Sequence, residues 1–450
     1  MSSTPSERQD LHLCVFVHGL WGSPGHLSFI SGSLRDAHPD LHLFSPKTNA
    51  GNLTYDGIEV GGERVTEEVE KELSELEAAG KKVTRMSVIG YSLGGLIARY
   101  VVGLLYSRGV FERGIEPVNF TTFATPHLGV RSPVIGWKNQ LFNVFGARTL
   151  SASGTQLFAT DTFRDTGRPL LAVLADPGSI FVRGLALFQK RSLYANIIND
   201  RSVTFYTAGL SRHDPFVNLD LVNLHPLDGF EGVILDPASP ASPKTDDFTA
   251  LDSISSTARA AVNAAPYALA MTVFLPIGIT AYLVNSGWQS YASVQRVREH
   301  ETKATAFRQF PLLLEDARRR AEHAVESLSA AAREEDYLPE SVESASSLVS
   351  SVDTTSEAAA RNDGEGKEAM VREKTEPAHV APASDAPWPT LALTSEQFAM
   401  IDTLQPMFER YPVHISKATH SHAAIIRRLN RESFSEGFIV ARHWVEGFIA

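Results

Sequence analysis

The chain has 450 residues, and 43% of them are hydrophobic, which is enough apolar material for a large core. Its formal net charge of −11 argues against nucleic acid as a main partner, because phosphate backbones attract basic surfaces. The single cysteine, Cys14, excludes an internal disulfide and suits a reducing compartment.

The N-terminal residues MSSTPSERQD lack the basic start, the clean apolar stretch and the cleavage site of a secretory signal. The short apolar run that follows them, at residues 11–17, predicts a buried strand instead. We therefore expect a protein that is not secreted and that works on the cytoplasmic side.

Apolar runs and helix-like stretches alternate between residues 11 and 235. Strands are expected at residues 11–17, 41–46, 85–90, 118–126 and 194–200, the last of them extended by 203–209. Helices are expected within 56–80 and at 93–109, where apolar residues recur at helical spacing. This alternation predicts an α/β fold with a mostly parallel central sheet and helices on both faces, and residues 11–235 are the first part of that core.

The composition changes after residue 235. Residues 236–259 predict a linker, 260–295 an apolar membrane-associated segment or a lid, 296–335 a charged helical region, and 336–387 a disordered low-complexity insertion. Residues 388–450 are expected to form the last part of the core, with a strand in 411–418 and a strand plus a helix in 436–450.

Residues 90–94, Gly-Tyr-Ser-Leu-Gly, fit the G-x-S-x-G pattern of a nucleophile elbow. An apolar strand precedes the pattern and a long apolar helix follows it. Small residues around Ser92 allow a tight strand-to-helix turn, which lifts the hydroxyl clear of the sheet at a helix N-terminus. The exposed N–H groups there favour a developing negative charge, so Ser92 is the predicted nucleophile.

A His-Gly turn, HGLWG at residues 18–22, follows the first predicted strand. Such a turn commonly supplies one N–H of an oxyanion hole, here that of Leu20, and Leu93 supplies the second. His18 and Gly19 are expected to line the site, with His18 as an orienting residue rather than a base. A glycine-rich turn without a catalytic role is the alternative.

Several segments together resemble the fungal "putative serine esterase" family of lipases, within the α/β-hydrolase superfamily. They are VHGLWGSPGHL (17–27), YDGIEVGGERV (55–65), VIGYSLGGLIARY (88–100), FATPHLGV (123–130) and YANIINDRSVTFYTA (194–208), and the similarity returns near SHAAIIRR (421–428). Some members act on phospholipids at lipid droplets. The resemblance therefore implies an α/β-hydrolase fold, a lipid ester substrate, and a membrane or lipid-droplet surface as partner.

Catalytic residues in α/β-hydrolases follow the order Ser, acid, His along the chain. Asp200 ends the predicted strand at 194–200 and matches the family's Asn-Asp turn, so it is the predicted acid. The alternatives are Asp214, and a role for Asp200 in capping its own turn. The family pattern places the catalytic His two residues before paired aliphatic residues, which selects His422 as the base and leaves His420 as the runner-up.

The remaining histidines indicate no metal site. His127 either lines the site or serves the turn in which it lies, His414 is expected to be structural, and His443 is expected to be a surface or packing residue. The histidines are scattered, and neither a paired-Cys nor an H-E-x-x-H spacing occurs. We therefore expect no metal, and without a Gly-rich nucleotide loop we expect no cofactor.

Residues 266–284 are about long enough to span a hydrocarbon core as one helix. A single crossing would separate Ser92 and Asp200, which precede the segment, from His422, which follows it. Two prolines and a glycine inside the segment favour a bent insertion that enters one leaflet and returns. A lid or a helix buried in the protein is the alternative.

These inferences predict a carboxylic-ester hydrolase that acts on phospholipid or acylglycerol through an acyl-enzyme. Acyl transfer to an alcohol on the same triad is one alternative. A catalytically silent, membrane-tethered binding protein is another, and the intact Ser, Asp, His and His-Gly turn argue against it.

Overall fold

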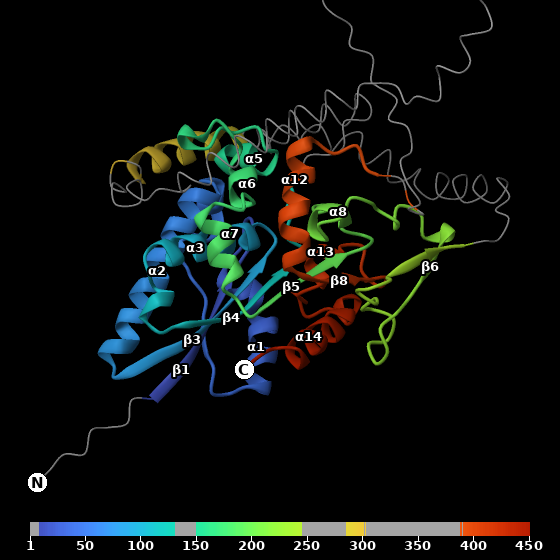
Figure 1. Ribbon diagram of the computed structural model, residues 1–450, viewed down its shortest axis with the longest axis horizontal. Coiled ribbons are helices and arrows are strands. Elements are labelled where there is room, and N and C mark those ends of the chain that lie inside the picture. The colour runs from blue at the N-terminus through green and yellow to red at the C-terminus, as the bar shows by residue number, and fades with distance from the viewer. Residues whose placement is uncertain (1–8, 131–149, 245–284, 301, 303–387, 389) are drawn as a thin grey trace, which may run out of the picture. The chain divides into compact units, whose positions relative to one another are not determined.

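The computed structural model describes residues 9–130, 150–244, 285–300, 302, 388 and 390–450 (Figure 1). The predicted apolar segment at 266–284 and the predicted insertion at 336–387 lie outside these residues, as does most of the charged region at 296–335. Among the described residues, no helix is both long enough and apolar enough to span a membrane.

A six-stranded parallel sheet forms the centre of the described chain (Figure 1). Its strands, in spatial order, are β2 (His42–Phe44), β1 (Gln9–Val17), β3 (Lys81–Tyr91), β4 (Glu116–Phe123), β5 (Lys190–Asn196) and β8 (Glu409–Val413). The predicted mostly parallel sheet is confirmed. The last strand comes from the C-terminal part of the chain, and its Val413 pairs with Asn196 of β5.

Both faces of the sheet are covered. Along β1, Leu13 and Val15 face one core and Cys14 and Phe16 face the other, as the two-residue period of a strand requires. The first core is closed by α2 (Ile58–Ala78), α3 (Leu93–Ser107), α7 (Ile180–Ala186) and α12 (Ser395–Leu404), and the second by α1 (Ser28–Ala37) and α14 (Glu436–Glu446).

Shorter elements connect these layers. They are η1 (Pro24–Leu27), η2 (Gly51–Tyr55), η3 (Phe111–Arg113), α5 (Ser151–Leu157), η4 (Arg164–Thr166), α6 (Leu170–Leu174), α8 (Phe205–Ala208), η5 (Leu219–Leu221), β6 (Val222–Leu224), β7 (Ala241–Pro243), η7 (Gln405–Met407), α13 (Ser421–Ala424) and η8 (Glu432–Phe434). Residues 285–300 are also helical. β7 pairs with β6 in a small antiparallel sheet, so a strand stands in part of the range that was predicted as a linker.

Two predicted strands are wrong. Residues 203–209 do not extend β5, because the chain turns at Asn199, which has a φ of 59°, and then forms the short helix α8. Residues 436–450 contain no strand, because Val440, Ala441 and Trp444 recur at helical spacing and bury one face of α14 in the second core.

A buried histidine makes stability depend on pH. Burial, assisted by Arg85, lowers the pKa of His12 to about 4, and its Nε2 lies 2.7 Å from Ser87 Oγ. The unfolded imidazole has a pKa of about 6.5, so the unfolded state takes up a proton first as the pH falls. We expect the free energy of unfolding to decline from about pH 6.5 towards pH 4.

Urea unfolding at pH 7.5, 6 and 5 measures this decline. His12→Gln keeps a partner for Ser87 and removes the titrating group, so its decline should be smaller. Equal slopes for both proteins would contradict the assignment to His12.

Candidate active site

Ser92 occupies a strained turn between β3 and α3. Its φ is 55° and its ψ is −130°, and its N–H donates to Phe123 O over 2.9 Å. The two glycines of the motif are required by close packing. A Cβ on Gly90 would lie 2.4 Å from Gly95 Cα, and a Cβ on Gly94 would lie 2.2 Å from Val17 O. The turn therefore holds Ser92 at the carboxyl edge of the sheet.

His422 connects Ser92 to Asp200. Its Nε2 lies 2.9 Å from Ser92 Oγ, and its Nδ1 lies 2.8 Å from Asp200 Oδ2. With the proton on Nδ1, the imidazole donates to the carboxylate and accepts the serine hydroxyl. The Asp200 side chain is 2% exposed and that of His422 is 16% exposed, so the acid is shielded while the imidazole reaches the surface.

Hydrogen bonds from its own loop and from the last residue of β5 also hold Asp200. Its Oδ1 accepts the N–H groups of Ser202 and Val203 over 3.0 and 2.8 Å, and its Oδ2 accepts Asn196 Nδ2 over 3.0 Å. The turn-capping role and the contact with His422 therefore coexist in one carboxylate. The alternative acid, Asp214, accepts the N–H of Phe216 within its own turn.

The segment that carries His422 is tied to the Asp200 loop. Ser421 Oγ donates to Ile198 O over 2.6 Å, and Ser421 N donates to Asn199 O over 3.2 Å. His420 is the exposed N-cap residue of α13 and makes no hydrogen bond with Ser92 or Asp200. The structure thus brings His422, rather than the runner-up His420, to the nucleophile.

Tyr91, which sequence reasoning did not single out, contacts His422 through both its hydroxyl and its ring. Its hydroxyl donates to His422 O over 2.9 Å, and its ring centroid lies 5.1 Å from the imidazole. Burial raises the pKa of Tyr91, so the hydroxyl keeps its proton and remains a donor.

Tyr91→Phe should lower kcat about fivefold with little change in KM, since a hydrogen bond of this kind contributes about 1 kcal/mol.

Tyr194→Phe is the matched control, because its buried hydroxyl bonds to a histidine away from Ser92, at 2.8 Å from His443 Nδ1. This control should leave kcat for a soluble ester unchanged. An unchanged kcat for Tyr91→Phe as well would remove Tyr91 from the positioning of the site.

The predicted oxyanion turn lies against the nucleophile. A Cβ on Gly19 would be 2.8 Å from Ser92 Cβ, so this position has room for glycine alone. Within the described residues, neither Leu20 N–H nor Leu93 N–H donates a hydrogen bond, which leaves both donors available. His18 is buried beneath the turn with Nδ1 3.1 Å from Gly19 O, and burial lowers its pKa, so it stays neutral.

Thr54 in η2 is buried and stabilises the His-Gly turn at residues 18–22. Its Oγ1 accepts the N–H of Trp21 over 3.0 Å and donates to Gly51 O over 2.7 Å. Trp21 has a φ of 53°, which a residue with a side chain rarely adopts without such support. A single threonine in a loop carries no sequence signal for this role.

His127 lies in the core rather than at the surface. Its side chain is fully buried, its Nε2 is 3.0 Å from Thr122 Oγ1, and its ring packs against Phe408. Burial, with the nearby Arg99 guanidinium, lowers its pKa well below the usual range. His414 follows β8, and its N–H donates to Val233 O.

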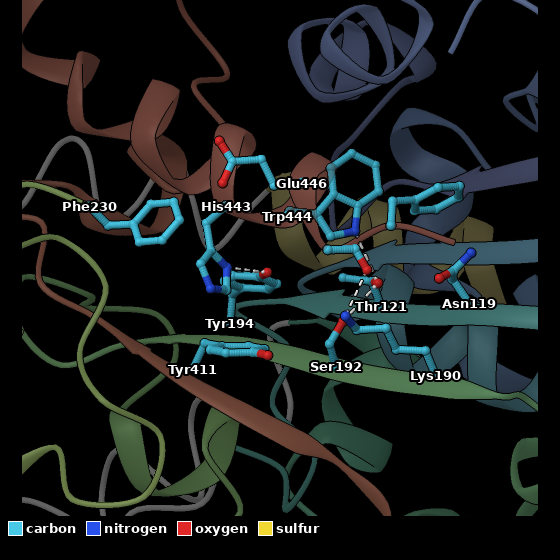
Figure 2. Close-up of a pocket in the computed structure, with 12 residues that line it drawn as sticks. Asn119, Thr121, Lys190, Ser192, Tyr194, Phe230, Tyr411, His443, Trp444 and Glu446 are labelled. Atoms are coloured by element: carbon cyan, nitrogen blue, oxygen red, sulfur yellow. Dashed lines mark hydrogen bonds between the residues drawn. The ribbon is translucent and has the colours of Figure 1, made fainter. Parts of the chain in front are cut away.

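A separate cavity of about 190 Å³ lies on the α14 side of the sheet (Figure 2). Tyr194, Tyr411 and His443 form part of its wall, and none of the residues around Ser92 lines it. Some of its polar groups are paired with one another, as in the bonds from Trp444 Nε1 to Thr121 Oγ1 over 3.1 Å and between Tyr194 Oη and His443 Nδ1 over 2.8 Å. No group of three or more metal-ligating side chains occurs within the described part of the chain.

The parallel sheet and the contacts among Ser92, His422 and Asp200 form an arrangement typical of α/β-hydrolases. Residues 7–212 match the family described as "Putative serine esterase (DUF676)", so this part of the chain is similar to that family. The matched range contains Ser92 and Asp200, whereas His422 lies beyond it.

Two curated fungal relatives carry the name of lipases. "Putative lipase C4A8.10" of Schizosaccharomyces pombe is 30% identical over 207 residues, which are 44% of this chain and 26% of the relative. "Putative lipase ROG1" of Saccharomyces cerevisiae is 29% identical over 214 residues, which are 46% of this chain and 29% of the relative. The chain thus spans less than a third of the length of these relatives.

Two solved structures were also matched. Phospholipase PlaB from Legionella pneumophila is 14% identical, with a TM-score of 0.25 over 44% of this chain and 41% of that one. A cutinase-like protein from Cryptococcus sp. is 12% identical, with a TM-score of 0.21 over 28% of this chain and 58% of that one.

Proposed function

We propose that this chain is a serine-dependent lipase or esterase that hydrolyses carboxylic esters of lipids, phospholipid or acylglycerol. The observation that carries the proposal is the position of His422, within hydrogen-bond distance of both Ser92 Oγ and Asp200 Oδ2. This is the arrangement that activates a serine hydroxyl for acyl transfer.

The reaction then proceeds in two halves. His422 Nε2 takes the proton of Ser92 Oγ as the oxygen attacks the ester carbonyl carbon, and Asp200 stabilises the resulting imidazolium. The N–H groups of Leu20 and Leu93 donate to the oxyanion. His422 passes its proton to the leaving alcohol, and then activates a water molecule that releases the carboxylic acid from the acyl-enzyme.

We further propose that the protein works at a membrane or lipid-droplet surface on the cytoplasmic side. The names of the relatives as lipases support a lipid ester as substrate. The uncharged composition of residues 260–295 supports attachment to lipid. The contact between Ser92 and His422, which flank that segment in the chain, supports an insertion that does not cross the bilayer.

Reaction with a fluorophosphonate probe tests the serine hydrolase assignment directly. The full chain should become labelled, and Ser92→Ala should not, while both retain the same thermal unfolding transition. A folded protein that resists the probe would favour the silent binding protein instead.

The products separate hydrolysis from acyl transfer. With a dispersed phospholipid or acylglycerol and an added alcohol, hydrolysis yields free carboxylic acid, and transfer yields the new ester. A lipidomic comparison of cells with and without the protein then identifies the lipid class.

A further inference from the structure

The helix at residues 285–300 (gold in Figure 1) exposes its apolar side chains. Trp288 is 67% exposed, Tyr291 61% and Val294 45%, whereas Ser286 and Ser293 are buried at 4% and 0%. The exposed residues recur every third position and form one stripe, with the Trp288 and Tyr291 rings 6.3 Å apart. A surface helix ordinarily buries its apolar side, whereas this helix exposes an apolar stripe and buries serine side chains.

Charged groups fix the inner face of the helix to the core. The Arg296 guanidinium contacts both carboxylate oxygens of Asp56, at 2.7 to 3.1 Å. The Asp56 side chain is 0% exposed and also binds Arg64 at 2.8 Å. One turn later, His300 Nε2 lies 2.6 Å from Glu63 Oε2. These bonds hold the C-terminal part of the helix against the core, with its aromatic stripe outward.

The composition of the stripe selects its partner. Trp and Tyr combine an apolar ring with a polar group, and they gather where a bilayer meets water. The stripe also lies at the end of residues 260–295, which contain no charged residue, so the chain enters this helix from a strongly apolar stretch. Both features fit a lipid surface better than a charged or polar partner.

The same helix is connected to the oxyanion turn. Arg296 Nη2 donates to Asn52 O over 3.2 Å, and with Asp56 this contact holds both ends of η2. Within η2, Thr54 accepts the N–H of Trp21, the residue after Leu20. A surface that touches the stripe is thereby held in a defined position relative to Ser92.

We propose that the outer face of helix 285–300, formed by Trp288, Tyr291 and Val294, is a lipid-contact surface that positions the catalytic core on its substrate-bearing membrane. This inference rests on the proposed function, since it assigns the surface by which the same site reaches lipid. The contact is apolar and interfacial, so it should be insensitive to salt.

Flotation of the purified full chain with neutral phosphatidylcholine vesicles tests the inference. The double variant Trp288→Ala/Tyr291→Ala should lower the fraction bound about tenfold, and Trp288→Phe/Tyr291→Phe should restore most of it. Leu187→Ala/Leu221→Ala is the matched control, because these residues are 44% and 42% exposed elsewhere on the core, and it should bind like the unmodified protein. All variants should hydrolyse a short soluble ester at the unmodified rate.

Equal flotation of the double variant and the unmodified protein would overturn the inference. So would self-association in the absence of vesicles that the double variant abolishes, since the stripe would then bind a second copy. If the unmodified protein binds vesicles but does not hydrolyse the soluble ester, the proposed function is contradicted, whereas the inference of a lipid-contact surface is not.

Discussion

Ser92→Ala is expected to lower kcat for a soluble ester by roughly 10³-fold or more. The substitution removes the one oxygen that His422 Nε2 contacts at 2.9 Å, so no acyl-enzyme can form. Alanine fits the elbow sterically, and the bonds from Ser92 N to Phe123 O and from Gly95 N to Ser92 O use the backbone alone. The fold should therefore survive.

Steady-state kinetics with a soluble ester, alongside near-UV circular dichroism, make this measurement. The unmodified protein prepared in parallel controls for a contaminating esterase. Turnover by Ser92→Ala near that of the unmodified protein would contradict the assignment of Ser92 as nucleophile.

His422→Ala is expected to cost about as much as Ser92→Ala, because the hydroxyl then has no base within reach. The double variant should lose little more than either single variant, since the residues of a triad act as a unit. Strictly additive losses from the two substitutions would show that Ser92 and His422 do not act together.

His420→Ala supplies the matched control for the base. The two histidines lie two positions apart around α13, yet His420 is exposed and makes no bond to the nucleophile. Its kcat should stay within about twofold of the unmodified value. If His420→Ala were the inactive variant, the base would move to His420 and the nucleophile would remain Ser92.

Local patterns in the sequence were sufficient to predict several strands of the sheet and the turn at Ser92. The apolar runs before Ser92 and before His18 predict β3 and β1, because a strand buried on both faces is continuously apolar. The G-x-S-x-G spacing predicts the elbow, since its glycines relieve contacts within a few residues of the turn. The predicted extension of β5 failed at Asn199, where a single positive φ redirects the chain.

The partners of the candidate site come from distant parts of the chain. The bond between Asp200 and His422 joins residues 222 positions apart, and Tyr91 reaches His422 across 331 positions. Sequence order and family resemblance singled out Asp200 and His422 one at a time, each beside an alternative. Their contact requires β8 to pair with β5, which no local spacing encodes.

Composition and short-range spacing by themselves therefore established the α/β class, the strand-to-helix turn at Ser92 and the His-Gly turn at residues 18–22, because neighbouring residues satisfy these features. Only the tertiary structure placed His422 between Ser92 and Asp200, brought Thr54 to the N–H of Trp21 and turned Trp288 outward. Each of these depends on a partner brought close only by folding, such as the buried Asp56 carboxylate that holds Arg296.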